Sequence, residues 1–418
     1  MGGVSMEWKE VRLGDVCEIK HGFAYKGKYF SDTPTCDILV TPGNFTLSGG
    51  FKLDKPKFYN GPVEKDYILS KGDLIVTMTD LSKNIDTLGY SALVPEVKGL
   101  TFHHNQRIGL VENIANNVDK YFLYWIMRTP AYQSFIATHS SGTTVHHTSP
   151  KGIGNYIFKL PPLDNQRRIA SILSSLDRKI ELNNKINADL EEMAQAIFKN
   201  WFVDFEPFKD GKFVDSELGM IPEGWKVGRL DEIADVVGGS TPSKAKPEYY
   251  TQKGIAWLTP KDLSNHPAVY TSRGEIDITE EGYNSTSTKL MPKGTVLFTS
   301  RAPIGYISIA QNDICTNQGF KSLVPKKAGT CFLYCFLKYV TPVIENKSTG
   351  STFKEASGSL MKSLQVIMPE QKVFEDFETI VSPLFARIES LEKENSRLSL
   401  LRDTLLPRLM SGELEVPE

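Results

Sequence analysis

The chain has 418 residues, of which 40% are hydrophobic and 23% are charged, so its composition is that of a folded protein and excludes an intrinsically disordered one. A single hydrophobic core rarely grows past roughly 250 to 300 residues, and we therefore expect at least two domains. The sequence contains no apolar run near 18 residues and no charged-then-apolar leader, which predicts a cytoplasmic protein without a membrane span.

Charge is distributed unevenly along the chain. The net charge of −2 argues against a simple nucleic-acid binder, because neutralisation of phosphates usually supplies the affinity of such proteins. Residues 1–160, however, hold 17 basic and 15 acidic side chains, and residues 225–366 hold 17 and 12. The acidic excess lies between and after these two blocks. This favours two surfaces that face DNA and separate acidic surfaces that face another partner.

The chain contains an internal repeat. Five segments of the first half return in the same order in the second half, at offsets that drift between 208 and 222 residues, as loop insertions would cause. The pairs are 8–16 with 225–233, 71–77 with 293–299, 105–106 with 317–318, 122–124 with 332–334, and 141–144 with 349–352. Chance pairing of common dipeptides would not keep this order.

Each copy of the repeat predicts a small α+β globule. β-rich runs at 73–78 and 295–300 lie among Gly, Pro, Asn and Ser turn signals, and helix-like aromatic stretches follow at 121–127 and 331–337. Each copy spans about 150 residues, which is a common domain size.

A heptad pattern follows each globule. Apolar residues recur every seven positions and predict two long helices that pack side by side, each about 50 Å long, with Pro161-Pro162 and Pro369 marking their starts. The first set of packing positions is Ile169, Leu176, Asn183, Leu190 and Ile197, then Phe377, Leu384, Leu391, Leu398 and Leu405. The second set, three residues later, is Ile172, Lys179, Ile186 and Met193, then Ile380, Arg387, Glu394 and Leu401.

Asn183 interrupts this apolar pattern. One interpretation is that its amide fixes the register against the other helix, since a buried polar residue at such a position specifies pairing. The other interpretation is a solvated Asn in an imperfect heptad.

The layout and four local sequences resemble those of the specificity subunit of type I restriction-modification enzymes, over nearly the whole chain. The motifs are Ile221-Pro222-Glu223-Gly224-Trp225, Gly238-Gly239-Ser240-Thr241-Pro242-Ser243, Thr299-Ser300-Arg301-Ala302-Pro303-Ile304-Gly305, and the tail 405–414. The resemblance implies a non-catalytic subunit that reads a split DNA target, docks two methyltransferase subunits, and is joined by motor-nuclease subunits. The first half fits less closely, because Thr77-Met78-Thr79-Asp80-Leu81 replaces the Arg-Ala-Pro-Ile-Gly sequence.

We therefore expect an α+β fold in which two similar target-recognition globules are separated by two long helices packed as an antiparallel coiled coil, with a pseudo-twofold internal repeat. The expected parts are a first recognition domain at 1–160, a spacer helix at 161–203, a linker at 204–224, a second recognition domain at 225–366, and a second spacer helix at 367–411.

Candidate DNA contacts are polar residues on loops, because Arg, Lys, Asn, Gln, Ser and Thr read base edges and phosphates. In the second copy they are Ser240, Thr241, Ser243, Lys244, Lys246, Ser300, Arg301, Asn317, Gln318, Ser351, Thr352 and Lys354. In the first copy they are Asn105, Gln106, Arg107, Thr143, Thr144, His146, His147 and Lys151. The alternatives are a surface or salt-bridged Arg301, a plain solvated turn at 240–246, and buried structural amides at Asn105 and Asn317.

Several signals of an enzyme are discounted. The sequence 22–29 nearly spells a P-loop, but Tyr29 replaces the Ser or Thr that binds magnesium. Asp86, Glu96 and Lys98 only imitate a nuclease triad, and the His and Cys pairs lack a four-ligand metal spacing. We expect no catalytic residue, cofactor or metal. The alternative from another class is a two-domain scaffold that binds proteins and has no DNA role.

Overall fold

The computed structural model describes residues 8–47, 49–80, 82, 85–348 and 354–416. The chain divides into two compact units, the first formed by residues 1–180 and 397–418 and the second by residues 181–396. The boundary crosses two long helices, α5 (Leu163–Phe202) and α11 (Gln371–Ser411), so that each unit holds one α+β globule and a part of both helices. No helix within the described ranges has the length and apolarity needed to cross a membrane.

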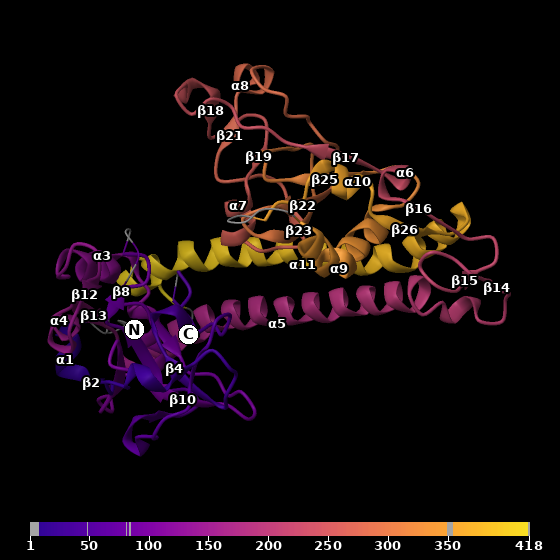
Figure 1. Cartoon of the computed structure of the whole chain (residues 1–418). Helices are drawn as coiled ribbons and strands as arrows, with labels where there is room; N and C mark the ends of the chain where they lie inside the picture. Colours follow the sequence, from indigo (N-terminus) through magenta and orange to yellow (C-terminus); the bar gives the residue numbers. More distant parts are fainter. Residues whose placement is uncertain (1–7, 48, 81, 83–84, 349–353, 417–418) are drawn as a thin grey trace, which may run out of the picture. The chain divides into compact units, whose positions relative to one another are not determined.

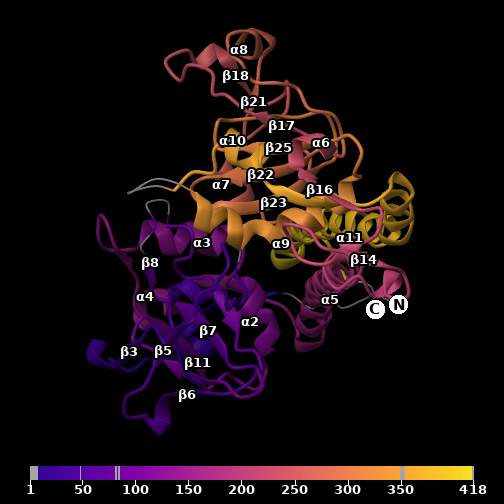
Figure 2. The ribbon, with the colours of Figure 1, turned by 45° about the vertical axis from the view of Figure 1, so that its right-hand side comes forward.

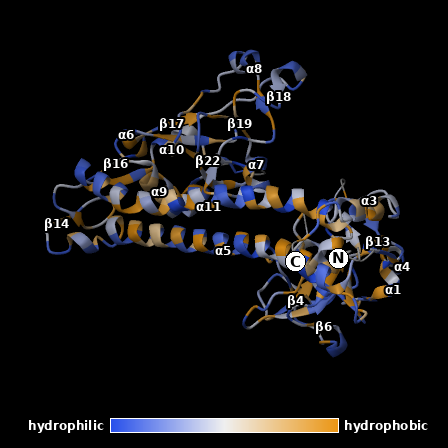
Figure 3. Cartoon of the chain, turned by 180° about the vertical axis from the view of Figure 1, so that it is seen from behind, coloured by the Kyte–Doolittle hydropathy of each residue, from blue (hydrophilic) through white to orange (hydrophobic). Residues whose placement is uncertain are grey.

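The two long helices run antiparallel in each unit (Figure 1). In the first unit Asp177 of α5 pairs with Arg402 of α11, and in the second unit Asn183 of α5 bonds to Asn395 of α11 while Phe198 packs on Phe377. Both helices alternate hydrophobic and hydrophilic residues along their length (Figure 3), as amphipathic helices do. The expected pair of long antiparallel helices is thereby confirmed.

The contact line between the helices differs in one respect from the expectation. Ile169, Asn183, Phe377 and Leu391 are buried as expected, and Leu176, Leu190, Ile197, Leu384, Leu398 and Leu405 are partly buried. The second set of packing positions was only partly right. Ile172, Lys179, Ile186 and Glu394 are partly buried, but Arg387 is exposed and Met193, Ile380 and Leu401 are 52%, 48% and 47% exposed. The buried residues lie four positions after the first set instead of three, at Leu173, Ala194, Val381 and Ile388. Where two apolar residues are adjacent, as Ile380 and Val381 are, the sequence fits a spacing of three residues and a spacing of four equally well.

In the first unit two sheets and two short strand pairs form the globule. A five-stranded sheet has the order β3-β5-β4-β10-β6 and a four-stranded sheet the order β2-β11-β7-β9, while β1 pairs with β13 and β8 with β12. The strands are β1 (Lys9–Arg12), β2 (Glu18–His21), β3 (Phe30–Ser31), β4 (Asp37–Val40), β5 (Lys57–Tyr59), β6 (Ile68–Leu69), β7 (Leu74–Thr77), β8 (Thr79–Asp80), β9 (Ser91–Leu93), β10 (Thr101–His104), β11 (Ile108–Glu112), β12 (His146–His147) and β13 (Ile157–Leu160). The short helices are α1 (Leu13–Val16), α2 (Lys120–Ile126), α3 (Pro130–Thr138) and α4 (Pro150–Gly154).

In the second unit the main sheet has the order β17-β25-β22-β23-β20, and four strand pairs, β14–β15, β16–β26, β18–β21 and β19–β24, surround it. The strands are β14 (Phe213–Val214), β15 (Ile221–Pro222), β16 (Lys226–Arg229), β17 (Ala234–Gly238), β18 (Tyr250–Thr251), β19 (Trp257–Leu258), β20 (Tyr270–Thr271), β21 (Asp277–Ile278), β22 (Val296–Ser300), β23 (Ile304–Ala310), β24 (Cys315–Thr316), β25 (Lys321–Pro325) and β26 (Gln365–Met368). The helices are α6 (Leu230–Ile233), α7 (Pro260–Asn265), α8 (Glu280–Asn284), α9 (Thr330–Lys347) and α10 (Gly358–Lys362).

The strand pairing reproduces the internal repeat. In the first unit β1 pairs with β13 and Val111 of β11 lies opposite Leu74 of β7, while in the second unit β16 pairs with β26 and Leu323 of β25 lies opposite Val296 of β22. These partners are related by the same offsets as the repeated sequence segments. The two units therefore share the same strand pairing, which confirms the internal repeat.

Helix α9 connects the main sheet of the second unit to both long helices (Figure 2). Phe332 of α9 lies with its ring centre 4.8 to 6.2 Å from those of Phe198 and Phe202 of α5 and Phe374 and Phe377 of α11. All five rings belong to one buried cluster. The two helix segments are thus part of the core of this unit.

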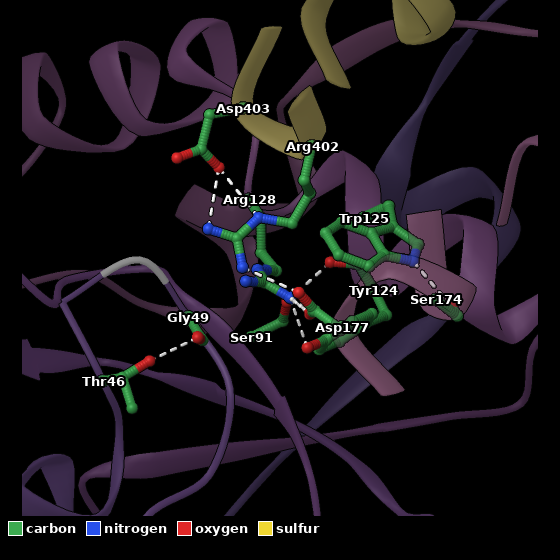
Figure 4. A network of polar contacts seen from close by, with 10 residues as sticks. All are labelled: Thr46, Gly49, Ser91, Tyr124, Trp125, Arg128, Ser174, Asp177, Arg402 and Asp403. Carbon is green, nitrogen blue, oxygen red and sulfur yellow. Dashed lines mark hydrogen bonds and ion pairs between the residues drawn. The ribbon is translucent and has the colours of Figure 1, made fainter. Parts of the chain in front are cut away.

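In the first unit a polar network joins the globule to both helices (Figure 4). Asp177 of α5 accepts a hydrogen bond from Arg128 at 2.8 Å and another from Arg402 of α11 at 2.7 Å. The guanidinium of Arg128 lies 4.3 Å from the ring centre of Trp125, and the Trp125 indole donates to Ser174 of α5 at 2.9 Å. Because Arg128 has only 3% of its side chain exposed, the pairing of its charge is required for burial.

The corresponding helices α2 and α9 are capped in different ways. In the first unit Asp119 accepts hydrogen bonds from two first-turn amides of α2. In the second unit Gly329 stands at that position, and Glu378 of α11 accepts from the amides of Cys331 and Phe332 at 3.3 and 2.8 Å. A Cβ atom on Gly329 would lie 2.2 Å from Cδ of Glu378, so glycine leaves room for the carboxylate. The long helix therefore supplies the cap that α9 lacks.

We predict that Asp177→Ala lowers the free energy of unfolding of the first unit by about 3 to 5 kcal/mol, because it removes the carboxylate shared by two largely buried guanidinium groups. Urea unfolding measures the effect. Asp164→Ala on the same helix is the matched control, since its ion pair with Arg167 is exposed and contributes less than about 1 kcal/mol. Equal losses for the two variants would contradict the role of Asp177.

We predict that Glu378→Ala speeds hydrogen exchange of the Cys331 and Phe332 amides about 5- to 30-fold, as loss of a cap worth roughly 1 to 2 kcal/mol requires. Exchange measured residue by residue tests this. Glu375→Ala, at an exposed position one turn earlier, should leave both amides unchanged.

Candidate nucleic-acid interface

The second unit brings several predicted DNA contacts together around one open groove of about 980 Å³. Five separate segments build it, namely the loop after β17, the segment from β18 to α7, Ile276 just before β21, the end of β22, and the turn between β24 and β25. Its predicted members are Thr241, Lys244, Arg301, Asn317 and Gln318, and it also contains Tyr250, Trp257 and Lys261.

The loop after β17 is held close to the turn at 316–319. A Cβ atom on Gly239 would lie 2.1 Å from the carbonyl oxygen of Thr316, so only glycine permits this approach. The Ser240 amide donates to the same oxygen at 3.0 Å. The Trp257 indole then donates to the Ser240 carbonyl at 3.1 Å, and the Tyr250 hydroxyl donates to the Pro242 carbonyl at 2.6 Å. Burial raises the pKa of Tyr250, which keeps this hydroxyl protonated.

Arg301 follows the last residue of β22, as the sequence suggested. Ser300 itself is fully buried and donates through both its amide and its hydroxyl to the Gly319 carbonyl, at 2.8 and 3.2 Å. Arg301 is partly exposed, and its Nη1 lies 3.4 Å from Oε2 of Glu355. The other oxygen of Glu355 lies 3.5 Å from Nζ of Lys321. The prediction of Ser300 as a DNA contact was therefore wrong, because its side chain is buried and bonds to the backbone inside the fold.

Asn317 and Gln318 take different roles in the turn. Oδ1 of Asn317 accepts a hydrogen bond from the Gly319 amide at 2.8 Å and so closes the turn. Gln318 is exposed, and its Oε1 accepts a hydrogen bond from the Thr241 hydroxyl. Asn317 is therefore a structural amide, and Gln318 is the side chain that the turn presents.

The first unit repeats this turn. Oδ1 of Asn105, which is 7% exposed, accepts from the Arg107 amide at 3.1 Å, while Gln106 and Arg107 are exposed. The Met78 amide donates to the Arg107 carbonyl at 2.9 Å, and the Thr148 amide donates to the Met78 carbonyl at 3.0 Å. The same two hydrogen bonds link Ser300 with Gly319 and with Ala356 in the second unit. The strand end, the turn and the loop before the short helix are thus joined alike in both copies.

The remaining candidates of the first unit lie on or near this joined region. His146 and His147 form β12, which pairs with β8, and Nδ1 of His147 lies 3.1 Å from the Thr79 hydroxyl. Nδ1 of His146 lies 3.5 Å from the Ser140 hydroxyl. Thr143, Thr144 and Lys151 are exposed.

Four other candidates of the second unit lie outside the groove. Ser240 is partly buried and Ser243 is exposed. Nζ of Lys246 donates to the Tyr249 hydroxyl at 2.8 Å, and this bond raises the pKa of Lys246. Nζ of Lys354 lies 3.4 Å from the Glu345 carbonyl oxygen. Ser351 and Thr352 lie outside the described residues.

Three residues near the groove were not predicted from the sequence. Tyr250, Trp257 and Glu355 carry no motif, because their roles depend on contacts between segments far apart in the chain. Within the described ranges no group of three or more His, Cys, Asp or Glu residues is placed to hold a metal ion.

We predict that Asn317→Ala lowers the free energy of unfolding by about 1 to 2 kcal/mol, because the buried Gly319 amide loses its partner. Gln318→Ala should change it by less than about 0.5 kcal/mol, since this side chain is exposed. Urea unfolding of the two variants side by side measures the difference. A larger loss for Gln318→Ala would reverse the assignment of roles.

Comparison with known proteins identifies the family. The family model of the type I restriction modification DNA specificity domain matches twice, at residues 6–192 and 222–399. The type I restriction enzyme HindI specificity subunit from Haemophilus influenzae is 27% identical over an alignment of 481 positions, which covers 98% of this chain and 100% of that protein. The MjaIX specificity subunit from Methanocaldococcus jannaschii is 40% identical over 190 residues, 45% of this chain and 44% of that protein.

The fold has a counterpart among solved structures. The crystal structure of the type I restriction-modification system S subunit from M. genitalium matches with a TM-score of 0.56 and 17% identity, over 98% of each chain. This likeness supports the fold alone. The two family matches cover most of the sequence, one in each half of the repeat. The chain therefore belongs to the family of type I restriction-modification DNA specificity subunits.

Proposed function

We propose that this chain reads a two-part DNA sequence through its two globules and contributes no catalytic group. The first recognition domain is assigned to residues 1–160 and the second to residues 225–366. The spacer helix 161–203 and the linker 204–224 join them, and a second spacer helix is assigned to residues 367–411. The observation that carries the proposal is the groove of the second unit, where Arg301, Lys244 and Gln318 come together from separate segments. Membership of a DNA specificity family supports the same conclusion.

The chemistry of the groove suits the major groove of a duplex. Arg, Lys and Gln side chains reach the hydrogen-bonding groups of base edges, while hydroxyls and lysines bind phosphates. In the first unit the exposed Gln106 and Arg107 stand at the tip of the equivalent turn. We assign base reading to these tips. Phosphate contacts are assigned to Thr143, Thr144, His146, His147, Lys151, Ser243, Lys246 and Lys354, and also to Ser351 and Thr352, which lie outside the described residues.

The long helices are proposed to set the distance between the two half-targets. Helices of 40 and 41 residues are about 60 Å long at 1.5 Å per residue, and two half-sites on one face of DNA are separated by multiples of about 34 Å. Asn183 is fully buried, and its Nδ2 lies 3.0 Å from Oε2 of Glu394 and 2.8 Å from Oδ1 of Asn395. These bonds favour its interpretation as the residue that fixes the helix register.

The catalytic work is assigned to partner subunits. A specificity subunit implies other subunits, and we propose two methyltransferase subunits, motor-nuclease subunits and double-stranded DNA as the partners, in the cytoplasm. Methyl transfer and cleavage would then reside in those partners.

The test uses the chain purified together with a methyltransferase subunit of a type I restriction-modification system from the same organism. Labelled methyl transfer to DNA should require both proteins, and mapping of the methylated positions should give two short sequences separated by a gap. Exchange of residues 225–366 for the equivalent segment of a relative should change one of the two sequences and leave the other unchanged.

Two results would overturn the proposal. Methylation by this chain alone would show that it is catalytic. Binding of DNA by the complex without sequence preference, or without a steep loss of affinity as salt rises, would favour a scaffold that binds proteins.

A further inference from the structure

Some polar side chains of the groove in the second unit are already bonded inside the protein, whereas others can still bind a ligand. Oδ1 of Asn317 is occupied by the Gly319 amide, and Oε1 of Gln318 is occupied by the Thr241 hydroxyl. Each of these amide oxygens therefore already accepts one hydrogen bond inside the protein. The amino groups of both side chains only donate, and they offer further polar atoms to a ligand.

Two carboxylates beside the groove also hold protein donors, Asp262 next to Lys261 and Glu355 next to Arg301. Among the described residues that line it, none is Asp or Glu. Oδ2 of Asp262 accepts from the amide and hydroxyl of Thr259 at 2.7 and 2.6 Å, and its Oδ1 accepts from the Glu275 amide at 2.8 Å. Glu355 lies between Arg301 and Lys321, 3.4 and 3.5 Å from their nitrogens. These carboxylates therefore hold protein donors in place.

The charged groups that line the groove are thus all donors. They are the guanidinium of Arg301 and the ammonium groups of Lys244 and Lys261, and Lys261 also lies 3.6 Å from the exposed carboxylate of Glu275. The amino groups of Asn317 and Gln318 add further donors, and the other polar side chains are hydroxyls or aromatic donors bonded to carbonyls. Glu355 contacts one end of the Arg301 guanidinium, which leaves further N–H groups of this planar fork available.

Such a groove matches one base better than the others. In the major groove guanine presents two neighbouring acceptors, N7 and O6, whereas adenine and cytosine each present an amino donor and thymine a methyl group. Among the groove side chains an amino donor would find no carboxylate, and the two amide oxygens each already accept a hydrogen bond. Arginine can also donate two parallel hydrogen bonds from its guanidinium group, one to N7 and one to O6 of the same guanine.

We propose that the second recognition domain reads guanine, with Arg301 donating to N7 and O6 and Glu355 acting as a positioning residue for Arg301. This inference rests on the proposed function and adds the identity of a base. It is confined to the second half-target, since Thr79 and Asp80 of the first unit stand where the second unit has Arg301 and Ala302.

The experiment uses the complex of the full chain with its methyltransferase. Bound sequences are selected from a random duplex library, and the half-target that changes on exchange of residues 225–366 is assigned to the second domain. This half should contain guanine. Replacing that guanine by 7-deazaguanine, which lacks the N7 acceptor, should weaken binding about 10-fold or more.

Variants of the groove test the residue. Arg301→Ala should remove discrimination at one guanine of the second half-target, about 10- to 100-fold, and leave the first half-target unchanged. Arg301→Lys should retain a weaker preference for guanine, because an ammonium still donates to N7 and O6. Glu355→Gln should reduce the preference without abolishing it. Lys289→Ala, at an exposed position outside the groove, is the control and should have no effect.

The outcomes separate the inference from the proposed function. If no sequence is selected from the library, the proposed function fails. If a two-part sequence is selected but the second half lacks guanine, or 7-deazaguanine has no effect, only the inference fails. If Arg301→Ala weakens binding to all sequences equally, Arg301 contacts phosphate and the inference is overturned.

Discussion

Each unit depends on the burial of the long helices beneath its own globule. In the second unit Phe332 of α9 contacts aromatic rings of both α5 and α11, so removal of either helix segment would open the hydrophobic core. In the first unit Leu409 and Met410 of α11 join the cluster that contains Phe122 of α2. Because segments of α5 and α11 are part of the hydrophobic core of each unit, they cannot rotate relative to the globule of that unit. The direction in which a globule presents its turns is therefore fixed relative to its own segments of the helices.

Polar side chains of the helices reinforce this packing by binding backbone groups of the globules. Glu392 of α11 accepts from the amides of Val269 and Tyr270 at 2.7 and 3.0 Å, and burial raises its pKa to about 7. Gln166 of α5 accepts from the Asp119 amide at 2.8 Å and donates to the Pro161 carbonyl at 2.7 Å. Because backbone groups do not change when side chains are replaced, such contacts survive changes in the surface of the globule.

The sequence predicted the repeat, the two long helices and three of the segments that form the candidate site. It could do so because periodicity and repeated motifs depend on local order. It did not separate Ile380 from Val381, since both are apolar and only the partner helix distinguishes them. It also did not separate Ser300 from Arg301, because the strand ends between them. The roles of Glu378 and Glu355 arise from contacts across more than 40 residues, for which the sequence carries no pattern.

The different roles of the residues in the turn affect how the sequence of this chain can evolve. Asn105 and Asn317 close the backbone, while Gln106 and Gln318 at the tips bear little of the fold. Under the proposed function, replacement of a tip residue changes the preferred DNA sequence at small cost in stability. One or two codon changes would then give a new recognition sequence without passing through an unfolded intermediate.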